Sequence, residues 1–194
     1  MRRTENARPA GLTNVTTLAG AAEDLDVAAA SFDAVICRLG LMLFAAPAQA
    51  LTAVRCALRP GGKVAVIVFT TPAANQFMAH PMQILLRHAG KTPPAPGDLC
   101  TRCARCARAF VGNGGLVGVQ QRTVVLPLRM PSAAQALAMM QEAFGAYRAV
   151  VSDRPEAVRV AAWTEVAETP KTFETPAGFV APAEVLVAAA VKPA

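Results

Sequence analysis

The sequence has few aromatic side chains and few charged ones. Aromatic residues make up 5% of its 194 positions and charged residues 16%, while hydrophobic residues reach 54%. This composition excludes an intrinsically disordered chain, because disordered proteins are poor in hydrophobic residues and rich in charge. Much of the hydrophobic share is alanine and valine. We therefore expect one globular domain whose core is built from small side chains.

The sequence also lacks a long hydrophobic run. Glycine, proline or a charged residue interrupts every candidate before the roughly 18 residues that a membrane-spanning helix needs. The basic N-terminus is not followed by the apolar stretch of a secretory signal. Five cysteines, an odd number, argue against a disulfide framework. These features together predict a cytoplasmic protein with reduced thiols.

The formal net charge of +6 comes from 19 Lys and Arg residues against 13 Asp and Glu residues. A nucleic-acid-binding surface usually gathers its basic residues on one stretch or one face. Here they are scattered, and the densest group, Arg102, Arg105 and Arg108, lies in an unusual segment described below. We therefore expect no nucleic-acid partner.

The hydrophobic pattern predicts a strand, a helix and a strand in the first part of the chain. Residues 34–37 form a continuous apolar run, which is typical of a strand covered on both faces. Residues 48–58 repeat apolar side chains at spacings of three and four, as an amphipathic helix does. Residues 60–62, Pro-Gly-Gly, should end that helix, and residues 63–69 then form the clearest buried strand. This order predicts a right-handed crossover between two parallel strands.

The same reasoning predicts further elements on either side of this unit. A β-branched run at residues 15–18 predicts an early strand, which leads into an acidic loop. The later elements that we expect are a helix over residues 76–88, a strand over 117–128, a helical face formed by Leu137, Met140, Phe144 and Tyr147, a helix over 155–168 capped by Asp153, and a final strand over 184–191.

Three segments carry a resemblance when their order and spacing are taken together. Residues 22–26 read Ala-Glu-Asp-Leu-Asp, residues 31–42 read Ser-Phe-Asp-Ala-Val-Ile-Cys-Arg-Leu-Gly-Leu-Met, and residues 58–66 read Leu-Arg-Pro-Gly-Gly-Lys-Val-Ala-Val. With these segments the chain resembles the class I S-adenosylmethionine-dependent methyltransferases, of the type 11-like kind that includes ubiquinone and menaquinone biosynthesis enzymes. The similarity is strong over residues 8–90 and extends in outline over 116–192.

The resemblance implies an α/β fold with a Rossmann-like methyltransferase sheet, helices on both faces, and the family's first two strands lacking. It implies one partial, N-terminally truncated domain over residues 1–194, because those two strands have no counterpart before residue 8. Residues 8–90 would form the core αβ part, 91–115 a loop segment rich in Pro, Cys and Gly, and 116–194 the C-terminal strands and lid-like helices.

The lacking strands would leave backbone groups unpaired at one edge of the sheet. Unpaired buried N–H and C=O groups cost about 1–3 kcal/mol each. The early strand at residues 15–18 could pair directly with residues 34–37, a partner chain could fill the space, or the early segment could be loose. We expect pairing or looseness. An exposed edge also gives a reason to expect homo-oligomers.

The resemblance further implies S-adenosylmethionine as the cofactor and a small, hydrophobic methyl acceptor. Ala21 and Ala22 would hold the adenine through backbone groups, since the family's usual polar side chain is absent at Ala21, and Glu23 adjoins them. Cys37 and Arg38 would border the methionine end of the cofactor. The family's glycine-rich turn and ribose-binding acid have no counterpart here. No catalytic residue is predicted.

Met42 and Phe44 would line the wall behind the methionine end. The acidic residues of the loop, Glu23, Asp24 and Asp26, are more simply explained as solvated than as an acid–base or metal cluster. His80 and His88 stand eight residues apart, a spacing that does not suit a metal pair, and we place both on the surface or in a lid.

Cys100, Cys103 and Cys106 form a C-x2-C-x2-C run in the segment where the similarity is lost. The run begins like a ferredoxin cluster motif, but Phe110 stands where a fourth cysteine would be, and zinc would need a fourth ligand such as His88. A locally shifted reading frame over residues 98–108 would explain both the odd composition and the lost similarity. A metal-binding protein is thus a third, weaker interpretation.

Two further alternatives stay open at the level of the sequence. Phe144, Tyr147, Trp163 and the pair Met139–Met140 could shape an acceptor pocket, although apolar helical stripes more often form core. The whole chain could also be a non-catalytic remnant or an interaction module of the same fold that binds no cofactor.

Overall fold

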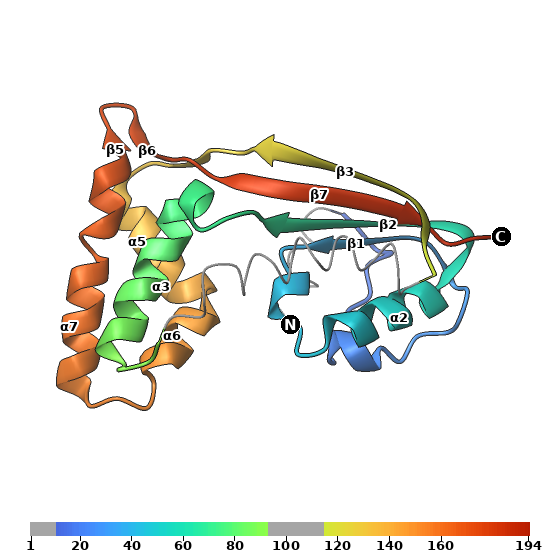
Figure 1. Ribbon diagram of the computed structural model, residues 1–194, viewed down its shortest axis with the longest axis horizontal. Helices are drawn as coiled ribbons and strands as arrows, with labels where there is room; N and C mark the ends of the chain where they lie inside the picture. The colour runs from blue at the N-terminus through green and yellow to red at the C-terminus, as the bar shows by residue number, and fades with distance from the viewer. Residues whose placement is uncertain (1–10, 93–114) are drawn as a thin grey trace.

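The computed structural model describes residues 11–92 and 115–194. A mixed four-stranded sheet with the order β1-β2-β7-β3 forms its largest element (Figure 1). The first two strands are parallel, and β7 runs antiparallel to both of its neighbours. The strands are β1 (Phe32–Arg38), β2 (Leu58–Phe69), β7 (Glu184–Val191) and β3 (Val117–Val125).

Helix α2 (Pro47–Ala57) joins β1 to β2 and confirms the predicted crossover. The helix ends at Ala57, three residues before the Pro-Gly-Gly sequence, which therefore lies inside β2 rather than ending the helix. Gly61 adopts a φ of +76°, which glycine accepts without strain, and its N–H donates to the Lys192 carbonyl at 2.9 Å. The glycine thus permits an irregular start to the strand.

One face of the sheet packs against α2. Alternate residues of β2, Val64, Val66 and Val68, are buried there together with Leu51 and Val54 of the helix. Successive side chains of a strand point to opposite faces, so this face, here called the covered face, takes every second residue of each strand. The first core of the protein lies between α2 and this face.

The remaining helices gather beyond one end of the sheet, where they stand side by side (Figure 1). A small sheet with the order β4-β6-β5 belongs to the same lobe. Phe77, Met140 and Phe179 are fully buried in its core. The elements of this lobe are α3 (Gln76–His88), β4 (Leu128–Met130), α5 (Ala133–Ala143), α6 (Gly145–Val151), α7 (Glu156–Val166), β5 (Glu174–Thr175) and β6 (Gly178–Ala181).

Four short 3-10 helices complete the described elements. They are η1 (Ala22–Asp24), η2 (Leu41–Leu43), η3 (Ala73–Asn75) and η4 (Thr169–Phe173). Within the described ranges no helix is long and apolar enough to cross a membrane.

The predicted early strand is wrong. Residues 15–18 are neither helix nor strand, and their side chains are exposed. A short β-branched run has strand propensity, but a strand forms only where its backbone finds a partner, and these residues do not pair with β1. Of the two expected alternatives, pairing with residues 34–37 is therefore excluded.

Strand β1 is also less covered than its apolar sequence predicts. It pairs with β2 on one side, and among the described residues its other edge has no strand partner. Ile36 is consequently 76% exposed. In the described part of the chain α2 covers one face of the sheet and the other α-helices lie beyond its end, whereas helices on both faces were expected.

Two predictions in the helical lobe need correction. The single face through Leu137 and Tyr147 is split between α5 and α6, which are separated at Phe144, although both helices contribute to the same core. Asp153 does not cap α7, because Pro155 occupies the position before the helix. Asp153 instead lies 3.4 Å from the Lys91 ammonium group.

Candidate functional site

Ligands of open α/β sheets bind beyond the carboxyl ends of the parallel strands, which here are the ends of β1 and β2. At the end of β1 the chain turns sharply, because Leu39 adopts a left-handed φ of +57°, which is uncommon for a bulky side chain. The Leu39 N–H still donates to the Ile67 carbonyl at 2.8 Å. Gly40 and η2 follow immediately.

Gly40 lies close to Cys37, which was predicted to border the cofactor, and to Phe44, which was predicted to line the wall behind it. A Cβ atom at this position would lie 3.2 Å from the Cys37 sulfur and 3.6 Å from the Phe44 ring. Cys37, Met42 and Phe44 are partly buried against the core under the covered face. The structure therefore brings these three side chains to one side of the β1 end.

Arg38 lies on the opposite side of the sheet. It follows Cys37 in the same strand, so the alternation of side chains directs the two residues to different faces. Arg38 is exposed, and its Cα is paired with that of Ile67 in β2. The two residues that were predicted to border the methionine end are thus not brought together on one face.

Glu23 acts on α2. Its carboxylate accepts a hydrogen bond from the Ala46 backbone N–H at 2.9 Å, at the start of the helix. The hydrogen bond from Ala46 holds the pKa of Glu23 below its ordinary value. Ala21 and Ala22, on the same 3-10 turn, offer backbone groups alone, and the Ala21 carbonyl already accepts from the Asp24 N–H at 3.2 Å. The adenine side of the predicted site therefore fits a cofactor only through main-chain contacts.

A polar cluster at the end of β2 was missed by the sequence analysis. The Thr70 hydroxyl donates to the Glu184 carboxylate at 2.6 Å and accepts from the Asn75 amide at 3.2 Å. The Asn75 side chain also donates to the Thr71 carbonyl at 3.0 Å and accepts from the Glu184 N–H at 2.9 Å. Asn75 is 3% exposed. This cluster fixes the point at which β2 ends, β7 begins and α3 is about to start.

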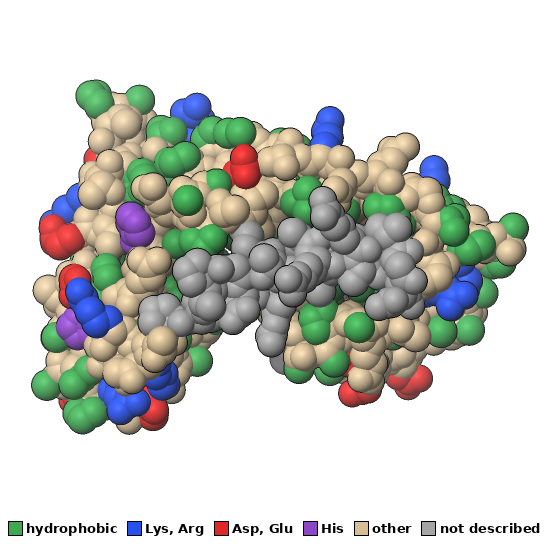
Figure 2. Space-filling model, viewed as in Figure 1, with side chains coloured by type: hydrophobic (Ala, Val, Ile, Leu, Met, Phe, Trp, Pro, Cys, Tyr) green, Lys and Arg blue, Asp and Glu red, His purple; other side chains and the backbone are tan. Residues whose placement is uncertain are grey.

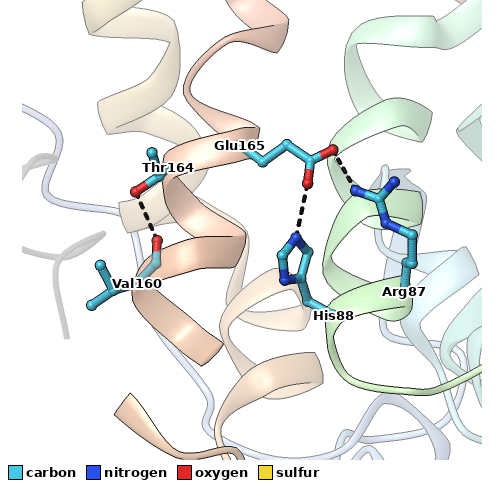
Figure 3. A network of polar contacts seen from close by, with 5 residues as sticks. All are labelled: Arg87, His88, Val160, Thr164 and Glu165. Atoms are coloured by element: carbon cyan, nitrogen blue, oxygen red, sulfur yellow. Dashed lines mark hydrogen bonds and ion pairs between the residues drawn. The ribbon is translucent and has the colours of Figure 1, made fainter. Parts of the chain in front are cut away.

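A second polar contact joins α3 to α7 (Figure 3). The Glu165 carboxylate lies 2.8 Å from the His88 Nε2 atom and also accepts from Arg87. Hydrogen bonds from His88 and then Arg87 hold the pKa of Glu165 below its ordinary value. The three residues line an open hollow of about 460 Å³. The contact ties α3 to α7.

The aromatic and methionine residues of the late helices belong to the core of the lobe. Met140 and Tyr147 are buried, and Met139, Phe144 and Trp163 pack against them. The Tyr147 hydroxyl donates to the Met78 carbonyl at 2.6 Å. The preference for core over an acceptor pocket is therefore confirmed.

The metal interpretation finds no support in the part of the chain that the structure describes. No group of three or more His, Cys, Asp or Glu side chains is placed there to hold a metal ion. The cysteine run at residues 100–106, and with it the hypothesis of a shifted frame, lies outside the described residues. On the face shown in Figure 2, Lys and Arg side chains lie at several places around the margin of the molecule.

Comparisons with known proteins bear on this site. A search of curated proteins gives no match. A sequence model of the methyltransferase domain family matches residues 1–66. The match covers about a third of the chain, and over these residues the chain is similar to the methyltransferase domain family. The matched part contains η1, β1, α2 and most of β2, and so includes every residue that was predicted to contact the cofactor.

Solved structures share the fold over nearly the whole chain. The YcgJ protein from Bacillus subtilis is 16% identical with a TM-score of 0.56, over 98% of this chain and 76% of that one. A Bacillus halodurans protein proposed to be a methyltransferase is 15% identical with a TM-score of 0.53, over 98% of this chain and 77% of that one. At such identities the likeness confirms the α/β, Rossmann-like methyltransferase fold.

Proposed function

We propose that this chain takes part in the transfer of a methyl group from S-adenosylmethionine to a small, hydrophobic acceptor. The match of residues 1–66 to the methyltransferase domain family carries the proposal. In such reactions the sulfonium cofactor supplies the reactivity, and the protein aligns donor and acceptor. Cys37 and the loop after β1 would adjoin the methionine end, and the backbone of Ala21 and Ala22 the adenine.

A non-catalytic interaction module of the same fold is the second candidate. Two observations favour it. The Glu23 carboxylate is engaged with the start of α2, and Arg38 lies on the face of the sheet opposite to Cys37. Both reduce the number of side chains that can meet at one cofactor. A cytoplasmic location stays a prediction from the sequence.

Calorimetric titration with S-adenosylhomocysteine and S-adenosylmethionine separates the two candidates. If the chain transfers methyl groups, we expect both ligands to give heat of binding and to raise the thermal unfolding temperature. We also expect labelled methyl groups to be transferred to at least one of a panel of small hydrophobic acceptors. No heat and no shift at millimolar ligand, with a folded protein, would rule out the first candidate and leave the second.

Two glycine variants make this titration specific for the loop after β1. Gly40→Ala places a methyl group 3.2 Å from the Cys37 sulfur, so it should weaken binding if this loop adjoins the cofactor. Gly145→Ala is the matched control, since its methyl group would meet only the Arg148 side chain at 3.8 Å. Equal loss in both variants would contradict the assignment of the loop.

We also propose that the free edge of β1 supports self-association. The Leu39 N–H points to β2, so the alternation of a parallel ladder directs the backbone groups of Ala34, Ile36 and Arg38 to the free edge. In the described part of the chain these groups have no hydrogen-bond partner. Free strand edges of this kind pair readily with another strand.

A further inference from the structure

The face of the central sheet opposite α2, here called the open face, has a distinct arrangement of charge. One row of directly paired residues crosses it, one residue from each strand. Arg38 of β1 pairs with Ile67 of β2, Ile67 with Val187 of β7, and Val187 with Arg122 of β3. The row thus has an arginine at each margin and two branched apolar side chains between them.

The charges on the open face have one sign. Lys63 of β2 points to the same side as Arg38 and Arg122, and all three are exposed. None of the three forms an ion pair with a residue in the described ranges. No Asp or Glu occupies an open-face position in the paired registers of the four strands. The face therefore attracts an anionic partner.

The centre of the open face is apolar, and its side chains are half-buried except for Ala189, which is exposed. Besides Ile67 and Val187 it carries Ala65 and Ala189, which are paired with each other in the neighbouring row. Small side chains flanked by larger ones let another element approach the backbone closely. In α/β proteins the element that buries such a sheet face is a helix.

The spacing of the arginines fits a helix lying along the strands. Three strand spacings of about 4.8 Å separate Arg38 from Arg122, which gives about 14 Å between their backbones. A helix with its side chains is about 10–12 Å wide. The paired stretch of β2, residues 63–69, is about 20 Å long, which corresponds to about 13 residues of helix.

We propose that the open face is the docking site for an amphipathic helix of a partner protein. The helix lies along β2 and β7, places its apolar stripe on Ile67 and Val187, and carries carboxylates on both flanks that reach Arg38 and Arg122. A second copy of this chain does not suit the site, because its own net charge is +6. A single-stranded nucleic acid is disfavoured too, since stacking platforms use aromatic side chains where this row has Ile and Val.

A pair of synthetic peptides tests the proposal by fluorescence anisotropy with the full chain. The first is a labelled, end-capped 14-residue helix with a Leu/Ala stripe and glutamates on both flanks. The second has lysine in place of each glutamate. We expect the acidic peptide to bind, with an affinity that falls as salt is added, and the basic peptide not to bind.

Charge-reversal variants locate the binding on the open face. Arg38→Glu combined with Arg122→Glu should weaken the acidic peptide at least tenfold. Arg159→Glu, an exposed position on α7, is the matched control and should leave the affinity unchanged. Ile67→Lys should also weaken binding, because it removes the apolar floor, and circular dichroism checks that each variant is folded.

Several results would overturn the proposal. These are no binding of the acidic peptide at millimolar concentration, equal binding of both peptides, or a loss with Arg159→Glu as large as with the double variant. Vesicles containing phosphatidylserine and an oligothymidylate of 14 nucleotides are tested in parallel. If the vesicles or the oligothymidylate bind, if Arg38→Glu with Arg122→Glu abolishes that binding, and if the peptide does not bind, the open face is a site for a lipid surface or a nucleic acid and the proposal is wrong.

Discussion

Replacing Asn75 with alanine tests whether the polar cluster at the end of β2 holds the central sheet to the helical lobe. The side chain makes three hydrogen bonds, and its loss affects their partners unequally. The Thr71 carbonyl keeps the hydrogen bond from the Ala74 N–H, and the Thr70 hydroxyl keeps its bond to Glu184. The Glu184 N–H, which is part-buried, loses its acceptor outright. With one orphaned group we expect a loss of about 1–3 kcal/mol in the free energy of unfolding.

Urea denaturation measures this loss, followed both by circular dichroism and by the fluorescence of Trp163, the single tryptophan. Asn75→Asp is the informative control. It keeps an oxygen for the Glu184 N–H but removes both donors and adds a carboxylate near that of Glu184. Its loss should therefore shrink as the pH falls and the introduced carboxylate becomes protonated. A change below about 0.5 kcal/mol for Asn75→Ala, the range of ordinary surface substitutions, would refute the reasoning.

Three further predictions concern other contacts. Glu165→Gln should remove part of the loss of protein stability at acid pH. The pKa of Glu165 is lowered in the folded protein, so its stabilising effect is fully present above its ordinary pKa of 4.5 and is lost as the pH falls through the lower folded pKa. Urea midpoints measured from pH 2 to 7 check this. The same fall in midpoint at acid pH for the variant and the unchanged protein would contradict it. Phe179→Ala, at a fully buried side chain packed 4.9 Å from the Phe77 ring, should cost about 3–5 kcal/mol in chemical denaturation, and a loss below 1 kcal/mol would contradict the packing. Ile36→Pro removes an N–H at the free edge of β1 and should shift sedimentation towards monomer. The control Val160→Ala, at an exposed position on α7, should leave sedimentation unchanged. Unchanged sedimentation of Ile36→Pro would exclude self-association through this edge.

The parts of the fold that the sequence predicts are those in which local pattern and tertiary contact agree. The helix over residues 76–88 and the strand over 184–191 have the predicted bounds, because their apolar periodicity is also their packing. Residues 15–18 fail because strand propensity is local, whereas a strand requires a distant partner. The prediction that residues 34–37 are covered on both faces fails at Ile36 for a related reason, since a hydrophobic run does not reveal which element covers it.

The candidate site was predictable only as a region. The end of β1 could be located because the segments at residues 31–42 and 58–66 carry the family resemblance. The opposite directions of Cys37 and Arg38, and the engagement of Glu23 with α2, depend on strand register and on the docking of η1. The cluster of Thr70, Asn75 and Glu184 was invisible, since 109 residues separate Asn75 from Glu184.

The position of β7 has a consequence for how the protein is made. This strand comes last in the chain, yet it lies between β2 and β3 and pairs with both. During synthesis β1, α2 and β2 leave the ribosome long before residues 184–191, and β3 has no neighbour in the sheet until those residues arrive. The core under the covered face therefore closes only after translation of the final strand. Until then the edges of β2 and β3 that later pair with β7 are unpaired in the nascent chain. Such open strand edges are sites for chaperones or for aggregation.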